Sequence, residues 1–204
     1  MDYLTPILTA LAGFVVAILA SAKPAVQRRI ISWIDPREKR ERKYLHGLEQ
    51  IAHLYAFFKA ISQITAVDRV ILFIGHNCGG VPSPTAPYWV CAIYGHSNHA
   101  NKDPLMMYGY DIPVDTSYIE MLTKIIKDGK FEFITAESRE CKLKSLYEHE
   151  GVKQSLVYYL GLFNERLVYM TVATYSEQQF NKKDKMEIEM LVERVRAFYE
   201  ETYS

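Results

Sequence analysis

Histidine and cysteine side chains near residues 76–99 have the types and short spacings of metal ligands. His76 and Cys78 are two residues apart, and His96 and His99 are three apart. Such pairs are typical of zinc sites. However, His76 follows the apolar run 69–75, which we interpret as one limb of a hairpin, and His96 follows the other limb. The two pairs then lie at opposite ends, roughly 23 Å apart for a seven-residue strand. The sequence therefore predicts no metal site.

The three cysteines, Cys78, Cys91 and Cys141, are candidates for redox chemistry. Cys91 falls within an apolar run, where a buried, inert thiol is expected. Their number and uneven spacing exclude a disulfide scaffold. The sequence contains no glycine-rich phosphate loop, nucleophile-elbow serine or His-Glu-x-x-His helix. We therefore predict no catalytic residues, no enzymatic activity and no cofactor.

Tyrosine is the most prominent residue type that could recognise a ligand. The chain has 15 tyrosines, and a ring with a hydroxyl can stack on a flat molecule and hydrogen-bond to its edge. Neighbouring polar side chains could complete such a pocket. The alternative is that the rings fill core and surface while the polar groups cap helices. The candidate ligand-binding residues are Tyr108, Tyr110, Asp111, Thr116, Tyr118, Tyr147 and His149.

Composition limits the class of protein. The chain has 204 residues, with 24 basic and 24 acidic side chains. A net charge of zero argues against a chain-wide nucleic-acid binder, which needs a basic surface. Apolar residues make up 49% and aromatic residues 13%, so there is ample surface to bury and a disordered chain is excluded. We expect one folded domain with an appendage and no nucleic-acid partner.

Residues 3–22 form an uncharged run of 20 residues. As a helix, this run would span about 30 Å, the thickness of a bilayer's hydrocarbon core. The stretch 23–43 then carries eight basic and three acidic side chains, and such clusters mark the cytoplasmic side. The sequence predicts a single-pass inner- or plasma-membrane protein, held in lipid by residues 3–22, with its N-terminus outside and the rest cytoplasmic. The alternatives are a cleaved signal peptide and a buried core helix.

The basic stretch also contains a segment suited to a membrane surface. Arg28 and Arg29 could lie near anionic lipid, with Trp33 at the depth of the headgroups. The alternative is a plain charged linker.

The remaining chain has the pattern of one mixed domain. Apolar residues at steps of three and four predict helices over 44–65, 116–128 and 184–202. Apolar or alternating runs predict strands over 69–75, 88–95, 105–114, 131–135, 155–163 and 166–175. Asn164 and Glu165 form a hairpin turn, and 137–149 is short helical or irregular. The predicted divisions are a transmembrane anchor (1–22), a basic juxtamembrane linker (23–43) and a cytoplasmic domain (44–204).

Two stretches of this domain are typical of a known fold. Gly151–Val157 (GVKQSLV) leads a glycine-led strand into the hairpin, and Phe180 to Asp184 forms an aromatic-x-x-x-Asp turn before the last helix. With the long helix before the first strand, they make residues 44–203 resemble a GAF domain, the small-molecule sensor fold related to PAS. The resemblance implies an α+β fold: about six mostly antiparallel strands, flanked by N- and C-terminal helices. It also implies a ligand pocket between the sheet and the segments around 105–150.

The chain departs from two specialised branches of that family. Phe180 and Asp184 match the end of the cyclic-nucleotide-binding pattern Asn-Lys-x-x-Phe-x-x-x-Asp-Glu, but Lys185 replaces its glutamate. Ser176 and Glu177 stand where that pattern has Asn-Lys. No cysteine neighbours a histidine, so the bilin-attaching Cys-His pair of phytochromes is missing. The sequence therefore predicts neither ligand.

These features lead to three functional hypotheses. We predict a membrane-anchored cytoplasmic GAF-like sensor or docking module, non-enzymatic, that binds a small molecule or a protein partner. An alternative is a membrane effector of phage or antiphage-defence type, whose GAF-like domain controls clustering of the anchor. A remote alternative is a thiol-dependent reductase, because one branch of GAF proteins reduces free methionine sulfoxide with cysteines.

The first and last helices also suggest an assembly. In GAF proteins these helices commonly pack together and against a second subunit. The first helix is longer than a compact sheet needs for cover, so its N-terminal apolar groups lack an intramolecular partner. We expect a parallel homodimer with Leu45, Leu48 and Tyr55 at the seam. The alternative is a monomer in which this helix is a solvated stalk.

Overall fold

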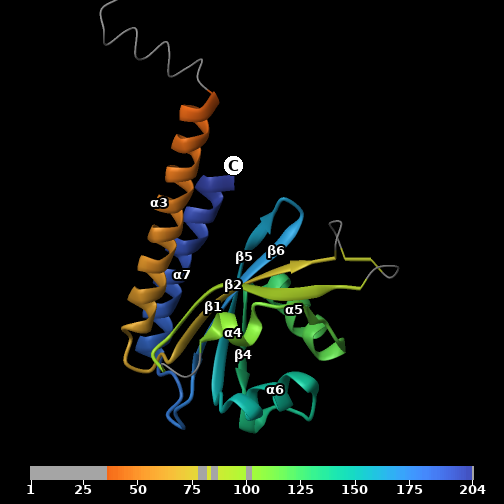
Figure 1. Ribbon diagram of the computed structural model, residues 1–204. Helices are drawn as coiled ribbons and strands as arrows, with labels where there is room; N and C mark the ends of the chain where they lie inside the picture. The colour runs from red at the N-terminus through yellow and green to blue at the C-terminus, as the bar shows by residue number, and fades with distance from the viewer. Residues whose placement is uncertain (1–35, 78–81, 84–86, 100–102, 204) are drawn as a thin grey trace, which may run out of the picture. The chain divides into compact units, whose positions relative to one another are not determined.

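A computed structural model describes residues 36–77, 82–83, 87–99 and 103–203 of the protein (Figure 1). The chain divides into two compact units, Met1–Ala52 and His53–Ser204. The elements, in chain order, are α3 (Pro36–Ser62), β1 (Arg69–His76), β2 (Trp89–Ser97), α4 (Pro104–Tyr108), β3 (Ile112–Pro113), α5 (Thr116–Asp128), β4 (Lys130–Ile134), the 3-10 turn η1 (Thr135–Glu137), α6 (Lys142–Glu150), β5 (Gln154–Phe163), β6 (Arg166–Thr174) and α7 (Lys182–Tyr203).

The predicted localisation in the inner or plasma membrane is wrong. Across the part of the chain that the structure describes, no helix combines the length and the apolar character needed to cross a bilayer. The long helices α3 and α7 carry charged side chains along their length. The apolar run 3–22 and the predicted interface residues Arg28, Arg29 and Trp33 lie outside the described residues. The membrane-effector hypothesis depends on that run and stays untested.

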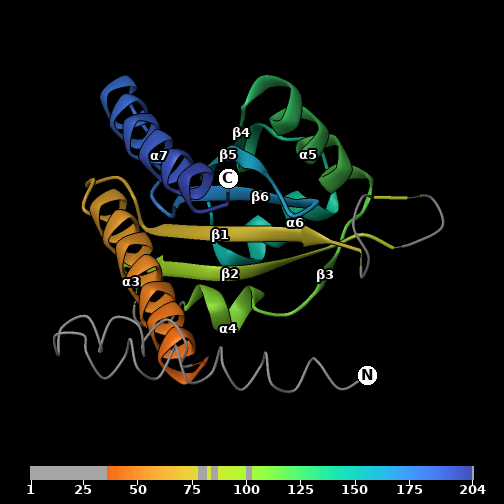
Figure 2. The same cartoon turned by 90° about the horizontal axis from the view of Figure 1, so that it is seen from above.

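The strands of the described residues belong to one antiparallel sheet with the order β3-β2-β1-β6-β5-β4. Figure 2 shows β1 lying between β2 and β6. This arrangement confirms the expected α+β class and the expectation of about six mostly antiparallel strands. The two faces of the sheet are packed separately, so the second unit contains two apolar clusters.

One cluster lies between the sheet and the long helices. Phe58 and Ile61 of α3 and Ile188 of α7 are fully buried there against strands β1, β5 and β6. The opposite face is covered by α4, α5 and α6, which lie on the other side of the sheet from α7 in Figure 1. Because β-strand side chains alternate between faces, each central strand serves both clusters.

The β5–β6 hairpin and the start of α7 follow the predicted pattern. Asn164 and Glu165 both have positive φ, at 49° and 63°, as a two-residue turn with the twist of the flanking strands requires. Gly151 ends α6 in the left-handed region with φ 79°, which glycine adopts without steric cost. Before α7, the Asn181 and Asp184 side chains each accept a hydrogen bond from the other's backbone N–H, at 3.0 Å. This reciprocal cap explains the aromatic-x-x-x-Asp turn.

Two elements differ from the prediction. The strand expected over 105–114 is mostly the helix α4, because the Asp103 carboxylate caps the Leu105 N–H at 2.9 Å and Pro104 suits a first helical turn. The first helix begins at Pro36 rather than residue 44. Its opening turns consist of charged residues with high helix propensity, which create no apolar periodicity.

Candidate ligand site in the tyrosine layer

A layer of buried tyrosines fills the space between the sheet and the helices α4 to α6. Tyr108 comes from α4, Tyr118 from α5, Tyr147 from α6 and Tyr169 from β6, and all four are buried in one cluster. We call these four residues the tyrosine layer. Phe73 stacks on Tyr169 with ring centroids 5.1 Å apart and an interplanar angle of 7°. The layer therefore holds flat rings from four elements against one sheet face.

The hydroxyl groups of this layer are bonded within the protein, at long distances. The Tyr118 and Tyr169 hydroxyl oxygens lie 3.3 Å apart, and the Tyr147 hydroxyl donates to Ser155 Oγ at 3.3 Å. Hydroxyl pairs are typically about 2.7–2.8 Å apart, so these contacts are weak. Burial raises the pKa of Tyr118, Tyr147 and Tyr169. The phenols therefore stay neutral and can donate or accept.

An ion pair is buried at one edge of the layer. Arg69 Nη1 lies 2.8 Å from Glu150 Oε2, and both side chains are only 2% exposed. The same nitrogen donates to the Tyr108 hydroxyl at 3.1 Å, and the guanidinium lies 5.3 Å from the centre of the Tyr108 ring. Burial alone would lower the pKa of Arg69, but the Glu150 carboxylate outweighs it and the pKa is raised. A permanently charged guanidinium, paired with the Glu150 carboxylate, therefore lies beside the tyrosines.

In strands β1 and β6, two buried polar side-chain atoms on this face have no hydrogen-bond partner among the described residues. They are Arg69 Nε and Thr171 Oγ1. Thr171 lies opposite Ile71 and Val157 in the sheet, and both of those residues belong to the cluster around the tyrosine layer. Because directly opposite residues point to the same face, Thr171 faces the layer too. A buried donor without a partner costs about 1–3 kcal/mol, so the two atoms need an explanation.

The structure brings together only some of the predicted ligand-binding residues. Tyr108, Tyr118 and Tyr147 belong to the tyrosine layer. The other four, Tyr110, Asp111, Thr116 and His149, are exposed, Tyr110 to 65%. Asp111 lies 2.9 Å from His76 instead. A ligand-binding role for these four residues stays a prediction.

Sequence reasoning missed Arg69, Glu150, Tyr169 and Thr171. Arg69 and Glu150 are charged residues beside apolar runs, and each looks like the end of an element. A charge that begins an otherwise apolar strand is the one signal that could have indicated a buried ion pair. Tyr169 and Thr171 carry no such signal, because both are ordinary residues of a β-strand.

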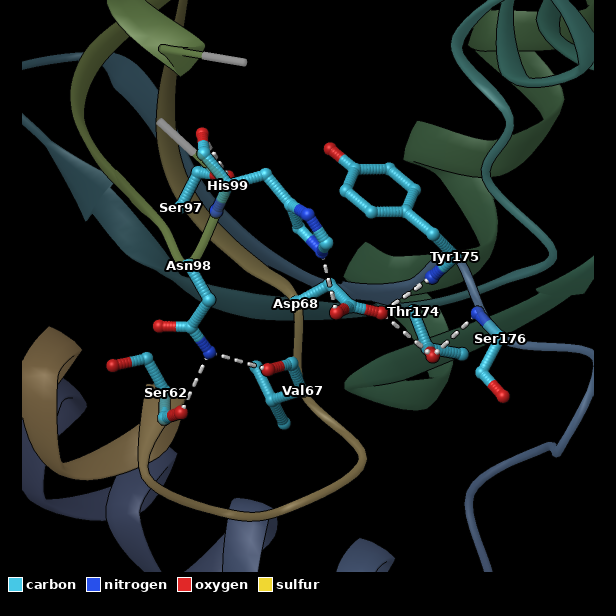
Figure 3. Close-up of polar contacts among 9 residues, drawn as sticks. All are labelled: Ser62, Val67, Asp68, Ser97, Asn98, His99, Thr174, Tyr175 and Ser176. Carbon is cyan, nitrogen blue, oxygen red and sulfur yellow. Dashed lines mark hydrogen bonds and ion pairs between the residues drawn. The ribbon is translucent and has the colours of Figure 1, made fainter. Parts of the chain in front are cut away.

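A second polar cluster joins the strand ends next to the layer (Figure 3). Asp68 Oδ1 lies 2.9 Å from His99 Nε2, while Oδ2 accepts from the Tyr175 N–H at 2.7 Å and the Thr174 hydroxyl at 3.0 Å. The Asn98 side chain donates to the carbonyls of Ser62 and Val67. Asp68 thus ties the start of β1 to the end of β6 and to the segment after β2.

Replacing Asp68 by asparagine should lower the stability of the fold by an amount that depends on pH. Burial opposes ionisation of Asp68, but hydrogen bonds from the Tyr175 N–H, His99 and Thr174 prevail, so its pKa is lowered in the folded state. The resulting stability is present above the unfolded pKa of about 3.9 and is lost as the pH falls through the folded pKa. At pH 7 we expect Asp68→Asn to reduce the free energy of unfolding by about 1–3 kcal/mol.

Chemical denaturation of both proteins between neutral and acidic pH measures this difference. The difference in the free energy of unfolding should begin to narrow below about pH 4, where the Asp68 carboxylate of the unfolded chain takes up its proton, and should vanish only below the lowered pKa of the folded state. Asp128→Asn, an exposed change at the end of α5, is the matched control and should show no such narrowing. If the difference in the free energy of unfolding between wild type and Asp68→Asn stays constant down to the acid transition, the stabilising role of the ionised carboxylate is contradicted.

Of the three cysteines, Cys91 and Cys141 do not form the close pair that a dithiol reductase needs. Cys91 and Cys141 are free thiols. Cys91 lies opposite Ile74, which packs on the cluster at the long helices, whereas Cys141 packs on the cluster at the tyrosine layer. The two thiols therefore lie on opposite faces of the sheet. Cys78 is outside the described residues.

Comparison with known proteins supports the fold. No protein-family model matches the chain, and no curated protein matches it significantly. Solved structures of GAF domains, in contrast, match the fold of this chain. The GAF domain region of a Geobacter sulfurreducens protein has a TM-score of 0.54 at 10% identity, covering 78% of this chain and 98% of that one.

Two further structures give the same result. The GAF domain of a two-component sensor histidine kinase from Bacillus halodurans has a TM-score of 0.51 at 9% identity, covering 73% of this chain and 92% of that one. A GAF domain of Synechocystis in its photoproduct state has a TM-score of 0.53 at 8% identity, covering 75% and 95%. At these identities the likeness concerns the fold alone. The protein therefore has a GAF-like α+β fold, as the sequence resemblance implied.

Proposed function

We propose that the protein is a non-enzymatic small-molecule sensor whose ligand binds in the tyrosine layer. The observation that carries the proposal is the pair of buried polar atoms, Arg69 Nε and Thr171 Oγ1, which have no partner in the described part of the chain and face the same packed rings. Acceptor groups of a ligand would satisfy these two atoms. The GAF-like fold of sensor proteins such as the Bacillus halodurans kinase supports this class of function.

The composition of the layer indicates the chemistry of the ligand. Flat aromatic faces favour a planar ring system, and neutral phenols can bond to its edge. Arg69 favours a carboxylate or phosphate, because its guanidinium can present two N–H groups to such an anion. Glu150 occupies one of those groups at present. The proposed ligand is therefore a planar heterocycle carrying one acidic group.

A cavity beside the layer provides a route for such a molecule. It has a volume of about 270 Å³ and lies between α5, β4 and the segment 138–143. Met121, Phe133 and Leu143 line it and also belong to the cluster around the tyrosines. Lys124, Arg139 and Glu120 also line this cavity. Glu120 pairs with Arg139, so Lys124 supplies the net positive charge. An acidic molecule could enter here and displace the weak contacts between hydroxyls.

Replacing Thr171 by valine tests the proposal, because valine keeps the shape and removes the hydroxyl. Flavin mononucleotide, folate and indole-3-acetate serve as planar acidic probes in thermal unfolding and isothermal titration with the full chain. We expect at least one of them to bind, and Thr171→Val to weaken it about tenfold or more, because the bond to a charged ligand is worth about 1.5–3 kcal/mol. Tyr158→Phe, a buried tyrosine on the other face, should leave the affinity unchanged.

The stability of Thr171→Val measured without any ligand distinguishes a ligand site from a purely structural role of Thr171. If no ligand belongs here, Thr171→Val removes an unsatisfied buried hydroxyl and only raises the stability. Equal affinities of wild type and Thr171→Val for the bound probe would contradict the site.

We further propose that the protein acts as a homodimer through α3. Leu45, Leu48 and Tyr55 are 59%, 48% and 40% exposed, and their spacing places them within one stripe of the helix. Tyr55 also contacts Tyr94 edge-on, with ring centroids 5.8 Å apart. Only part of the Tyr55 ring is therefore free to contact a second copy of the chain. The exposed leucines are the specific support for a second copy, because burying them would remove apolar surface from water.

A further inference from the structure

Three side chains with metal-binding atoms meet at one end of the sheet. His76 ends β1, Cys91 lies in β2 and Asp111 immediately precedes β3. Their ligand atoms all lie within 4.8 Å of one another, and His76 Nε2 is 2.9 Å from Asp111 Oδ1. Within residues 36–77, 82–83, 87–99 and 103–203, no other three such groups are this close.

The strand register holds these groups in place. Cys91 lies opposite Ile74 of β1, and Val90 lies opposite Ile112 of β3, so continuing the antiparallel register brings Asp111 beside Cys91. Directly opposite side chains share a face, and His76 follows Ile74 by two residues on that same face. Three neighbouring strands therefore present the three ligands together, which sequence spacing alone does not show.

We propose that His76, Cys91 and Asp111 form a binding site for a divalent transition metal of the zinc class. An imidazole nitrogen, a thiolate and a carboxylate oxygen suit that class, and three protein ligands leave one tetrahedral position for water. Zinc–ligand bonds of this kind place ligand atoms about 3.2–3.8 Å apart. The widest separation, at most 4.8 Å, needs to shrink by only about 1 Å, and the 2.9 Å between His76 and Asp111 needs to widen slightly. Side-chain rotation can supply both movements, because the His76 and Asp111 side chains are 22% and 55% exposed.

A second histidine–aspartate pair, His99 and Asp68, has a structural role and serves as a comparison. His99 and Asp68 lie at the same distance of 2.9 Å, but the other Asp68 oxygen accepts from the Tyr175 N–H and the Thr174 hydroxyl. Asp68 is thus committed to joining strand ends. Asp111, by contrast, accepts from no backbone N–H in the part of the chain that the structure describes, and it has a thiol beside it.

Cobalt(II) is the probe that tests the site, because a cobalt–thiolate bond has a charge-transfer absorption band. The full chain is stripped with chelator and titrated with Co²⁺, and Zn²⁺ then displaces the cobalt. We expect one equivalent to bind and the band to appear. Cys91→Ser should abolish the band, and both Cys91→Ser and Asp111→Asn should weaken binding by at least the 10–100-fold that is typical of lost metal-site contacts.

Two matched variants serve as controls. Cys141→Ser removes the other described free thiol, and His99→Ala removes the histidine of the structural pair. Both should bind cobalt like wild type. Cys91→Ala provides a second thiol-free variant if Cys91→Ser fails to fold, as judged by circular dichroism. A band that survives loss of the Cys91 thiol, an unchanged affinity in Asp111→Asn, or no saturable binding of Co²⁺ or Zn²⁺ would each overturn the proposal.

Discussion

Replacing Glu150 by leucine is expected to lower the free energy of unfolding by about 3–5 kcal/mol. The reason is the buried Arg69 guanidinium, which lies 2.8 Å from the Glu150 carboxylate with both side chains 2% exposed. Removing the carboxylate leaves a positive charge in an apolar cluster, and arginine cannot escape by losing its proton. Urea denaturation of the full chain at neutral pH measures the loss.

A double variant distinguishes the destabilisation caused by an unpaired buried charge from the net stabilisation that the ion pair provides. Arg69→Met combined with Glu150→Leu replaces both charges with apolar groups, and we expect it to be more stable than Glu150→Leu alone, because replacing a whole buried pair is often neutral. Lys130 and Glu189 form an exposed pair at 2.5 Å and provide the control. Glu189→Leu should cost less than about 1 kcal/mol. A Glu150→Leu loss no larger than this would contradict the buried pair.

Leu48→Glu is expected to dissociate the proposed homodimer. The substitution replaces an exposed apolar side chain of α3 with a charge, and it occurs twice in each dimer. Losing the burial of two leucines costs about 3–6 kcal/mol, which corresponds to an increase of about 10²–10⁴-fold in the dimer dissociation constant. Light scattering and sedimentation equilibrium of the full chain measure the change.

Met106→Glu is the control for this experiment. Met106 lies on α4 and is even more exposed, at 82%, so its replacement adds the same charge away from α3. We expect Met106→Glu to remain dimeric. A wild-type chain that sediments as a monomer at all concentrations, or a Leu48→Glu variant that dimerises like wild type, would contradict the assembly.

Local chemistry explains which parts of the fold could be predicted. The β5–β6 hairpin combines two runs of strand-favouring residues with two turn residues. The Asn181–Asp184 cap depends only on four consecutive residues. Helix α4 was missed because a five-residue helix is too short for a periodic pattern, and its cap at Asp103 decides against the strand. Helix α3 extends through charged residues that favour helix without any apolar stripe.

The candidate site was predictable in its residue type but not in its partners. The predicted tyrosines that reach the layer, Tyr108, Tyr118 and Tyr147, lie on three different helices, and the density of tyrosine in the sequence was a usable signal. Arg69 and Glu150 are 81 residues apart, and no local pattern links them. The group of His76, Cys91 and Asp111 depends on the register of three strands, which the sequence does not specify. Exposure of Tyr110 and His149 likewise follows from tertiary packing.

Native mass spectrometry of the full chain, purified without denaturant, tests the ligand site most directly. We predict a bound small molecule that is released by denaturation, has a planar ring system and an acidic group, and is lost in Thr171→Val but kept in Tyr158→Phe. Wild type that carries no such molecule, and that binds none when mixed with an extract of small metabolites, would contradict a sensor role for the tyrosine layer.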